Sequence, residues 1–227
     1  MKLSALTILV ISIFRCVASA QIPVPVANIT TVTEGSTTTH RANVDSDGGE
    51  IYVYIGGSFP MGTSPTTFTF LWDFVGRGGN STGYITPLLL ERVAGTSYTI
   101  YVVRAIGQGF SVAINSSPQT IPFNIVEGVA VTRNADYTFG YVNARVNARG
   151  QEVVSSPGTV DMDYPADGGP GVGPETLNTW GATGSPQPIT VALGTTIGGE
   201  SGTDFPWVDY YPIRTYSAQA QGTVSTQ

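Results

Sequence analysis

Short runs of β-branched and aromatic residues recur along the chain, and each is bounded by Gly, Pro, Asn or Ser. Residues of these types suit a pleated, partly buried sheet, and the bounding residues favour turns. With 28 glycines and 15 prolines in 227 residues, the chain turns too often for long helices. The best helical candidate, residues 87–94, is short and lacks a clear cap. We therefore expect an all-β fold, either an antiparallel β-sandwich or a jelly roll, with strands at 51–55, 68–72, 98–103 and 121–126.

The first twenty residues have the plan of a secretory signal peptide. Lys2 precedes an apolar run at 3–14, and a stretch of small residues follows that ends at Ala20. The run is shorter than the roughly 20 apolar residues that a transmembrane helix needs. We expect residues 1–20 to be removed during export, without membrane insertion, and residues 21–227 to form a single all-β domain that is secreted to the extracellular space.

The chain expected after this cleavage is strongly acidic. Of the 10 lysines and arginines, Lys2 and Arg15 lie in the leader, so eight arginines oppose 16 carboxylates and the net charge is −8 with histidine neutral. An acidic surface repels a phosphate backbone, and no basic patch with interleaved aromatic residues offsets it. We therefore expect no nucleic acid partner. The single cysteine also lies in the leader, so the fold must be stable without disulfides.

Residues 137–149 divide into two faces if the segment forms one extended strand. One face is small and apolar. The other changes from aromatic rings to amide and guanidinium groups, which suits a glycan or another surface polymer, because rings stack on sugars and Asn or Arg bonds hydroxyls. The alternative is that the aromatic half is core and the polar half is an ordinary wet strand face. The candidate ligand-binding residues of this strip are Tyr137, Phe139, Tyr141, Asn143 and Arg145.

Residues 155–187 lack periodicity and are rich in Gly, Pro and acidic residues, so we expect one long loop there. Trp180 is a large ring in this polar stretch; it either packs onto the domain or binds a ligand, and it joins the candidate ligand-binding residues. Asp161, Asp163 and Asp167 could supply the paired carboxylates of a glycan-active enzyme if the fold sets their separation. The alternative is a solvated acidic loop.

The stretch NVDSDGGEIYVY at residues 43–54 carries half of a calcium-binding pattern. In EF-type loops, side chains at positions 1, 3 and 5 and a backbone carbonyl at position 7 bind the ion, and a glutamate at position 12 completes the set. Position 12 here is Tyr54, so Ca²⁺ could bind only if another loop completed the shell. The alternative is a hairpin turn, which Asp-Gly favours. The candidate metal ligands are Asn43, Asp45, Asp47 and Gly49.

Other catalytic constellations are missing from the sequence. His40 is the only histidine, and no GxSxG nucleophile motif is present. We therefore expect a secreted, acidic β-sandwich that acts as an extracellular binding or structural surface module, with glycans as candidate ligands. The competing hypothesis is an extracellular glycan-active enzyme on a jelly-roll scaffold that uses carboxylates of residues 155–187.

Overall fold

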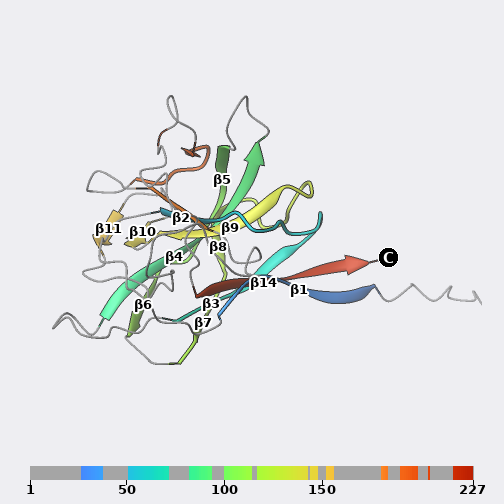
Figure 1. Ribbon diagram of the computed structural model, residues 1–227, viewed down its shortest axis with the longest axis horizontal. Coiled ribbons are helices and arrows are strands. Elements are labelled where there is room, and N and C mark those ends of the chain that lie inside the picture. The colour runs from blue at the N-terminus through green and yellow to red at the C-terminus, as the bar shows by residue number, and fades with distance from the viewer. Residues whose placement is uncertain are drawn as a thin grey trace, which may run out of the picture.

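The computed structural model describes antiparallel strands and the turns between them (Figure 1). The described residues contain no helix, and therefore no helix long and apolar enough to cross a bilayer. The expectation of an all-β, antiparallel fold is confirmed for this part of the chain. The described residues are 27–37, 51–71, 82–93, 100–113, 117–142, 144–147, 152–155, 180–183, 190–198, 204 and 217–226.

One sheet has four strands in the order β1-β14-β3-β7, so it brings together segments from both ends and from the middle of the sequence. β1 pairs with β14 along its whole length, from Asn28 opposite Thr226 to Ser36 opposite Ala218. Figure 1 shows these two strands running side by side. The strands of this sheet are β1 (Asn28–Ser36), β3 (Ser64–Phe70), β7 (Gln119–Pro122) and β14 (Ala218–Thr226).

The larger sheet has eight strands. Most follow the order β12-β2-β9-β4-β5-β13, while β6 pairs with one end of β4 and β8 pairs with β5. Pro87 has no N–H to donate, and it lies in β4 between the residues that pair with β6 and those that pair with β5. The segment 87–94, which looked most helical, therefore belongs mainly to a central strand. The strands are β2 (Ile51–Tyr54), β4 (Thr82–Val93), β5 (Ile100–Gly107), β6 (Phe110–Ala113), β8 (Ile125–Gly128), β9 (Tyr137–Val142), β12 (Trp180–Thr183) and β13 (Thr196–Ile197).

A separate two-stranded sheet joins β10 (Ala144–Val146) to β11 (Glu152–Ser155). The segment 137–149 is therefore not one long strand, as its alternation suggested. β9 ends at Val142, and β10 pairs with β11 instead of continuing along β2 and β4. Arg145, the polar residue of the predicted strip that lies in a described strand, thus belongs to another sheet than the aromatic half.

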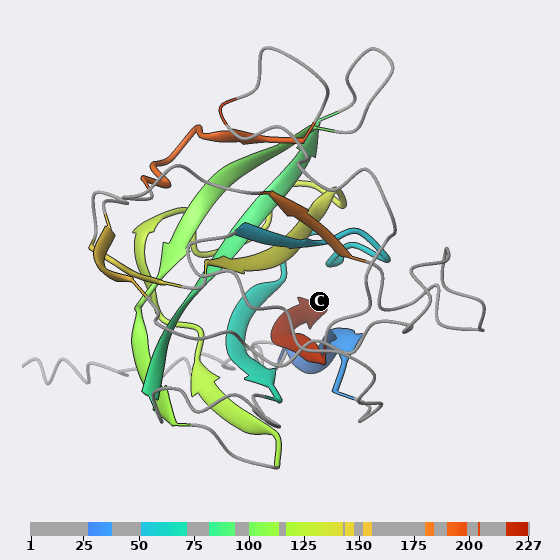
Figure 2. The same ribbon diagram turned by 60° about the vertical axis from the view of Figure 1, so that its left-hand side comes forward.

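An aromatic cluster contains side chains from the four-stranded and the eight-stranded sheets, which lie beside one another in Figure 2. The ring of Phe139 in β9 lies 6.0 Å from that of Phe68 in β3 and 5.0 Å from that of Tyr54 in β2, measured between centroids. Ala218 and Ala220 of β14 present small side chains to these rings. The rings of the aromatic cluster are Tyr52, Tyr54, Phe59, Phe68, Phe70, Phe123, Tyr137, Phe139 and Tyr141.

A second, mainly aliphatic cluster takes side chains from β2, β4, β5, β9, β10 and β13. In β4, for example, Leu88 and Leu90 belong to the aliphatic cluster, whereas Leu89 belongs to the aromatic one. All six residues of β9 are buried, because this central strand contributes to both clusters. The aliphatic cluster comprises Ile51, Val53, Leu88, Leu90, Tyr101, Val103, Ile106, Val142, Ala144, Val146, Val191 and Ile197.

The expected strands agree with the structure to different degrees. Residues 51–54 form β2, and the runs at 68–72 and 98–103 overlap β3 and β5. The run at 121–126 is instead divided between β7 and β8, which belong to different sheets. The chain leaves the first sheet after Pro122, which cannot donate a ladder hydrogen bond.

Candidate functional site

The exposed side chain of Arg145 is the starting point, because it is the described polar member of the predicted ligand-binding strip. Its backbone is held by Thr86 of β4, which is fully buried. The Thr86 hydroxyl donates a hydrogen bond to the carbonyl of Ala144 (2.7 Å) and accepts one from the amide of Val146 (3.3 Å). The two bonded residues lie on either side of Arg145. The backbone pairing of β4 with β9 ends at Val142, and beyond it the Thr86 side chain bonds the backbone of β10 instead.

Gly109 leaves room for the stem of Arg145. A Cβ added at Gly109 would lie 2.9 Å from Cγ of Arg145 and 2.8 Å from the hydroxyl oxygen of Thr86. Both separations are shorter than ordinary van der Waals contacts, so any larger residue would push Arg145 away. Gly109 lies in the connection between β5 and β6, which brings it from a different part of the sequence to the side of β10.

The guanidinium group of Arg145 lies over the ring of Tyr84, with Cζ 5.4 Å from the ring centroid. Tyr84 in β4 is partly exposed and pairs with the exposed Ser111 of β6. Opposite residues of an antiparallel pair share a face, so Ser111 lies next to Tyr84 on the side where Arg145 rests. The Tyr84–Arg145 patch is defined here as Tyr84, Gly109, Ser111 and Arg145.

The described arginines of the larger sheet, by contrast, are engaged with protein groups. Arg104 in β5 forms an ion pair with Glu91 of β4 through Nε and Oε2 (2.5 Å). Arg92 donates to the carbonyl of Ile55 (3.2 Å), and its guanidinium lies 5.8 Å from the ring centroid of Tyr101. Within the part of the chain that the structure describes, Arg145 forms no ion pair.

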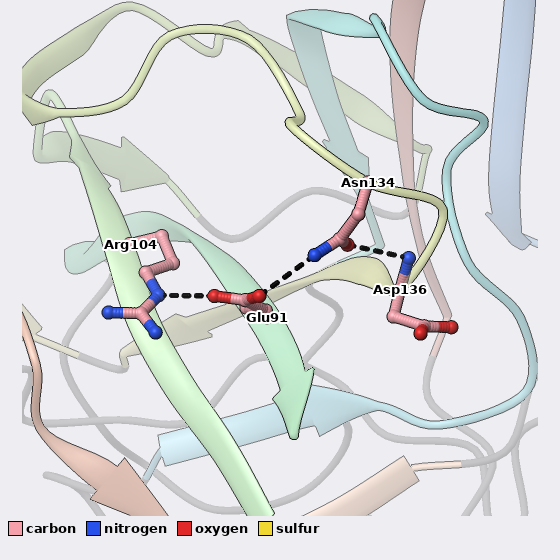
Figure 3. A network of polar contacts seen from close by, with 4 residues as sticks. All are labelled: Glu91, Arg104, Asn134 and Asp136. Atoms are coloured by element: carbon pink, nitrogen blue, oxygen red, sulfur yellow. Dashed lines mark hydrogen bonds and ion pairs between the residues drawn. The ribbon is translucent and has the colours of Figure 1, made fainter. Parts of the chain in front are cut away.

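The Glu91 carboxylate lies at the centre of a polar network on the larger sheet (Figure 3). Asn134 donates to it from the turn before β9 (2.9 Å), and the amide of Asp136 donates to the side-chain oxygen of Asn134 (2.9 Å). Partial burial by itself raises the pKa of Glu91, but the hydrogen bonds from Arg104 and Asn134 and the charge of Arg104 outweigh it and lower that pKa. This network joins β4, β5 and the turn before β9, so its role is structural.

A second carboxyl group, Glu34 of β1, lies against the backbone of Gly57. A side chain at position 57 would collide with it. Burial raises the pKa of Glu34, since no cation is among the groups that act on it. The pKa of Tyr54 is raised to about 12, mainly by burial and then by the negative charge of Glu34, against a hydrogen bond from the backbone of Gly35 that lowers it. Glu34 therefore lies at the rim of the aromatic cluster, on β1 of the four-stranded sheet, and not in the sheet that contains Arg145.

The aromatic half of the predicted strip is core. The side chains of Tyr137, Phe139 and Tyr141 are 2%, 0% and 0% exposed, and all three belong to the aromatic cluster. The interpretation of these rings as surface stacking platforms is corrected, because the four-stranded sheet covers that face of β9. Arg145 is exposed, and Asn143 lies outside the described residues.

Trp180 begins β12, where it pairs with Tyr54 of β2. Part of the expected loop at 155–187 is therefore strand, because residues 180–183 add an edge to the larger sheet. The backbone alone is described for these residues. The rest of the expected loop, residues 156–179 and 184–187, lies outside the described ranges, and so do Asp161, Asp163 and Asp167.

The candidate calcium ligands Asn43, Asp45, Asp47 and Gly49 also lie outside the described residues. In the ranges that the structure describes, no group of three or more His, Cys, Asp or Glu side chains could hold a metal ion. Calcium binding by this stretch therefore stays a prediction from the sequence.

Sequence reasoning missed Tyr84, Gly109 and Ser111. A signal for Tyr84 was present, since GYIT at 83–86 alternates with its Tyr and Thr on one face, as expected for a strand. The following Pro87 and leucines obscured this strand, because they looked like the start of a helix. No local pattern relates Gly109 or Ser111 to Arg145, since they meet only through the pairing of β4 with β6 and the crossing of β10.

Comparison of the chain with family models, with characterised proteins and with solved structures finds no match in any of the three.

Proposed function

We propose that the protein is a secreted, single-domain antiparallel β-sandwich that binds an extracellular glycan or a similar surface polymer through the Tyr84–Arg145 patch. One observation carries the proposal: an exposed guanidinium lies 5.4 Å over a partly exposed tyrosine ring. Aromatic rings pack on the apolar faces of sugars, and a guanidinium donates several hydrogen bonds to their oxygens. Ser111 adds a hydroxyl beside the ring.

The support beneath the patch favours binding over an incidental surface contact. Thr86 bonds the backbone on either side of Arg145, Gly109 gives the stem of Arg145 a close-fitting space, and Tyr84 lies in a strand paired with β6. A binding group that is already held in place loses less conformational freedom when a ligand arrives.

The sandwich part of the proposal is supported by the aromatic cluster. Its rings come from β3 of the four-stranded sheet and from β2 and β9 of the larger sheet, so one apolar layer separates the two sheets. Two sheets that share such a layer are the basis of a sandwich.

A glycan array tests this function. The wild-type protein is compared with Tyr84→Ala and Arg145→Gln, and Arg133→Gln is the matched control because Arg133 is exposed in the turn before β9. We expect wild type and the control to bind the same glycans, while both patch variants bind them more weakly without a change in fold, which circular dichroism checks.

Two results would contradict the proposal. One is that the wild-type protein binds no glycan; the other is that the control loses as much affinity as the patch variants. Incubation of each bound glycan with the protein then tests the competing enzyme hypothesis. Release of shorter sugars, detected by mass spectrometry, would support the enzyme.

A further inference from the structure

We propose that the Tyr84–Arg145 patch selects acidic glycans, that is, polymers whose sugars carry a carboxylate. This inference rests on the proposed function and narrows its ligand class. It follows from how the guanidinium of Arg145 is held and from the charges around it.

The guanidinium of Arg145 lies over the Tyr84 ring at a cation–π distance, with Cζ 5.4 Å from the ring centroid. The N–H donors of a guanidinium point outward in its plane, and the side chain of Arg145 is exposed, so donors are available to a ligand. Two of these donors match the spacing of the two oxygens of a carboxylate, which gives a bidentate, charge-assisted pair. A neutral sugar offers only single hydroxyls to the same donors, so its binding free energy gains less from Arg145.

The charges close to Arg145 permit this preference, although the net negative charge of the protein repels an acidic polymer at longer range. Glu91 is paired with Arg104, and Glu34 lies against Gly57 on the four-stranded sheet. Among the residues that the structure describes, no carboxylate forms an ion pair with Arg145. A ligand carboxylate that binds Arg145 therefore displaces no ion-pair partner among the described residues.

The direct experiment uses pairs of oligosaccharides that differ only in charge. Oligogalacturonate and oligoglucuronate are each compared with their fully methyl-esterified forms by titration calorimetry at low salt. The wild-type protein should bind at least one acid roughly tenfold more tightly than its ester, since a hydrogen-bonded charged pair of this strength corresponds to about that ratio. The difference should shrink at high salt, because exposed charges are screened.

Three variants locate the preference. Arg145→Gln should reduce the affinity for the acid roughly tenfold and weaken binding of the ester by much less, because the ester loses only hydrogen bonds to neutral oxygens. Arg145→Lys keeps the charge but not the planar fork, and we expect it to restore only part of the affinity. Gly109→Ala keeps Arg145 but displaces its stem, so it should also weaken binding of the acid. Arg133→Gln, which removes an equal charge elsewhere, is the control.

Each outcome has a distinct meaning. Acid and ester bound equally tightly would refute the inference while leaving the proposed function intact. Arg145→Gln without effect on the acid would refute the inference and also the placement of glycan binding at the Tyr84–Arg145 patch. No binding of any oligosaccharide, charged or neutral, would refute both. Free acetate, sulfate and the single sugar acid are tested alongside; binding of these small anions as tight as that of the oligomer would show a general anion site and overturn the assignment to acidic glycans.

Discussion

β9 and β10 are neighbours in the sequence, yet residues of the same predicted face have opposite environments in the two strands. Phe139 in β9 is 0% exposed within the aromatic cluster, whereas Arg145 in β10 is on the surface over Tyr84. Strand alternation places both residues on the same predicted face. The difference shows that alternation tells which side chains share a face, while the neighbouring sheet determines whether that face is covered.

The largest expected effect tests the core assignment of β9. Phe139→Ala should reduce the free energy of unfolding by about 3–5 kcal/mol, because it removes a fully buried ring from between the two sheets. Urea denaturation followed by tryptophan fluorescence measures this change. A loss below 1 kcal/mol would mean that the ring is exposed and that the first interpretation of the strip is right after all.

The next effect concerns the support of β10. Thr86→Val keeps the side-chain shape but removes the hydroxyl that bonds Ala144 and Val146, so it leaves buried backbone groups without that partner. We expect a loss of about 1–3 kcal/mol in unfolding free energy. Glycan affinity should fall as well, although Arg145 is still present. Unchanged affinity would show that Arg145 does not depend on this support.

A substitution of Glu91 tests how the start of β9 is stabilised, since Glu91 pairs with Tyr137 in the β4–β9 ladder. Its pKa is lowered below the ordinary value of 4.5, so its carboxylate contributes stability that is present above that value and is lost as the pH falls through the lowered pKa. Glu91→Gln should cost about 0.5–1.5 kcal/mol at neutral pH and nothing in strong acid. Chemical denaturation at several pH values measures the difference, and a pH-independent loss would assign it to packing.

The contribution of Glu34 to stability should depend on pH in the opposite sense to that of Glu91. The pKa of Glu34 is raised by burial, so the protonated form is favoured in the folded state, and that stabilisation is full below the ordinary pKa of 4.5 and is lost as the pH rises through the raised value. Glu34→Gln should therefore raise the thermal midpoint at neutral pH, with the gain disappearing in acid. A lower midpoint at neutral pH would show that the charged carboxylate is stabilising.

The smallest expected effect completes the comparison. Arg145→Gln should change the unfolding free energy by no more than about 0.5 kcal/mol, because surface substitutions rarely do more. Its effect should appear in ligand affinity instead. A stability loss approaching that of Phe139→Ala would mean that β10 is structurally equivalent to β9.

Local sequence pattern was sufficient for the class of fold and for several strands. β-branched and aromatic runs between turn residues predict β2 closely and parts of β3 and β5, because strand formation at these places agrees with local preference. The pattern failed at Pro87, where the change of neighbour from β6 to β5 accommodates a missing N–H inside a central strand. It failed again at 137–149, where the chain passes from one sheet to another.

The candidate site depended on contacts between distant parts of the chain. The sequence identified Arg145 as a polar residue of a strand, but only the folded sheet places it over Tyr84 and beside Gly109. The same fold removes the predicted rings of β9 from the surface, because Phe68 and its neighbours from the four-stranded sheet cover them. The alternation of side chains between two faces is a property of the local backbone. Exposure of a face to water depends instead on which other segments pack against it. The sequence alone therefore could not distinguish the buried aromatic half of the strip from its exposed polar residue Arg145.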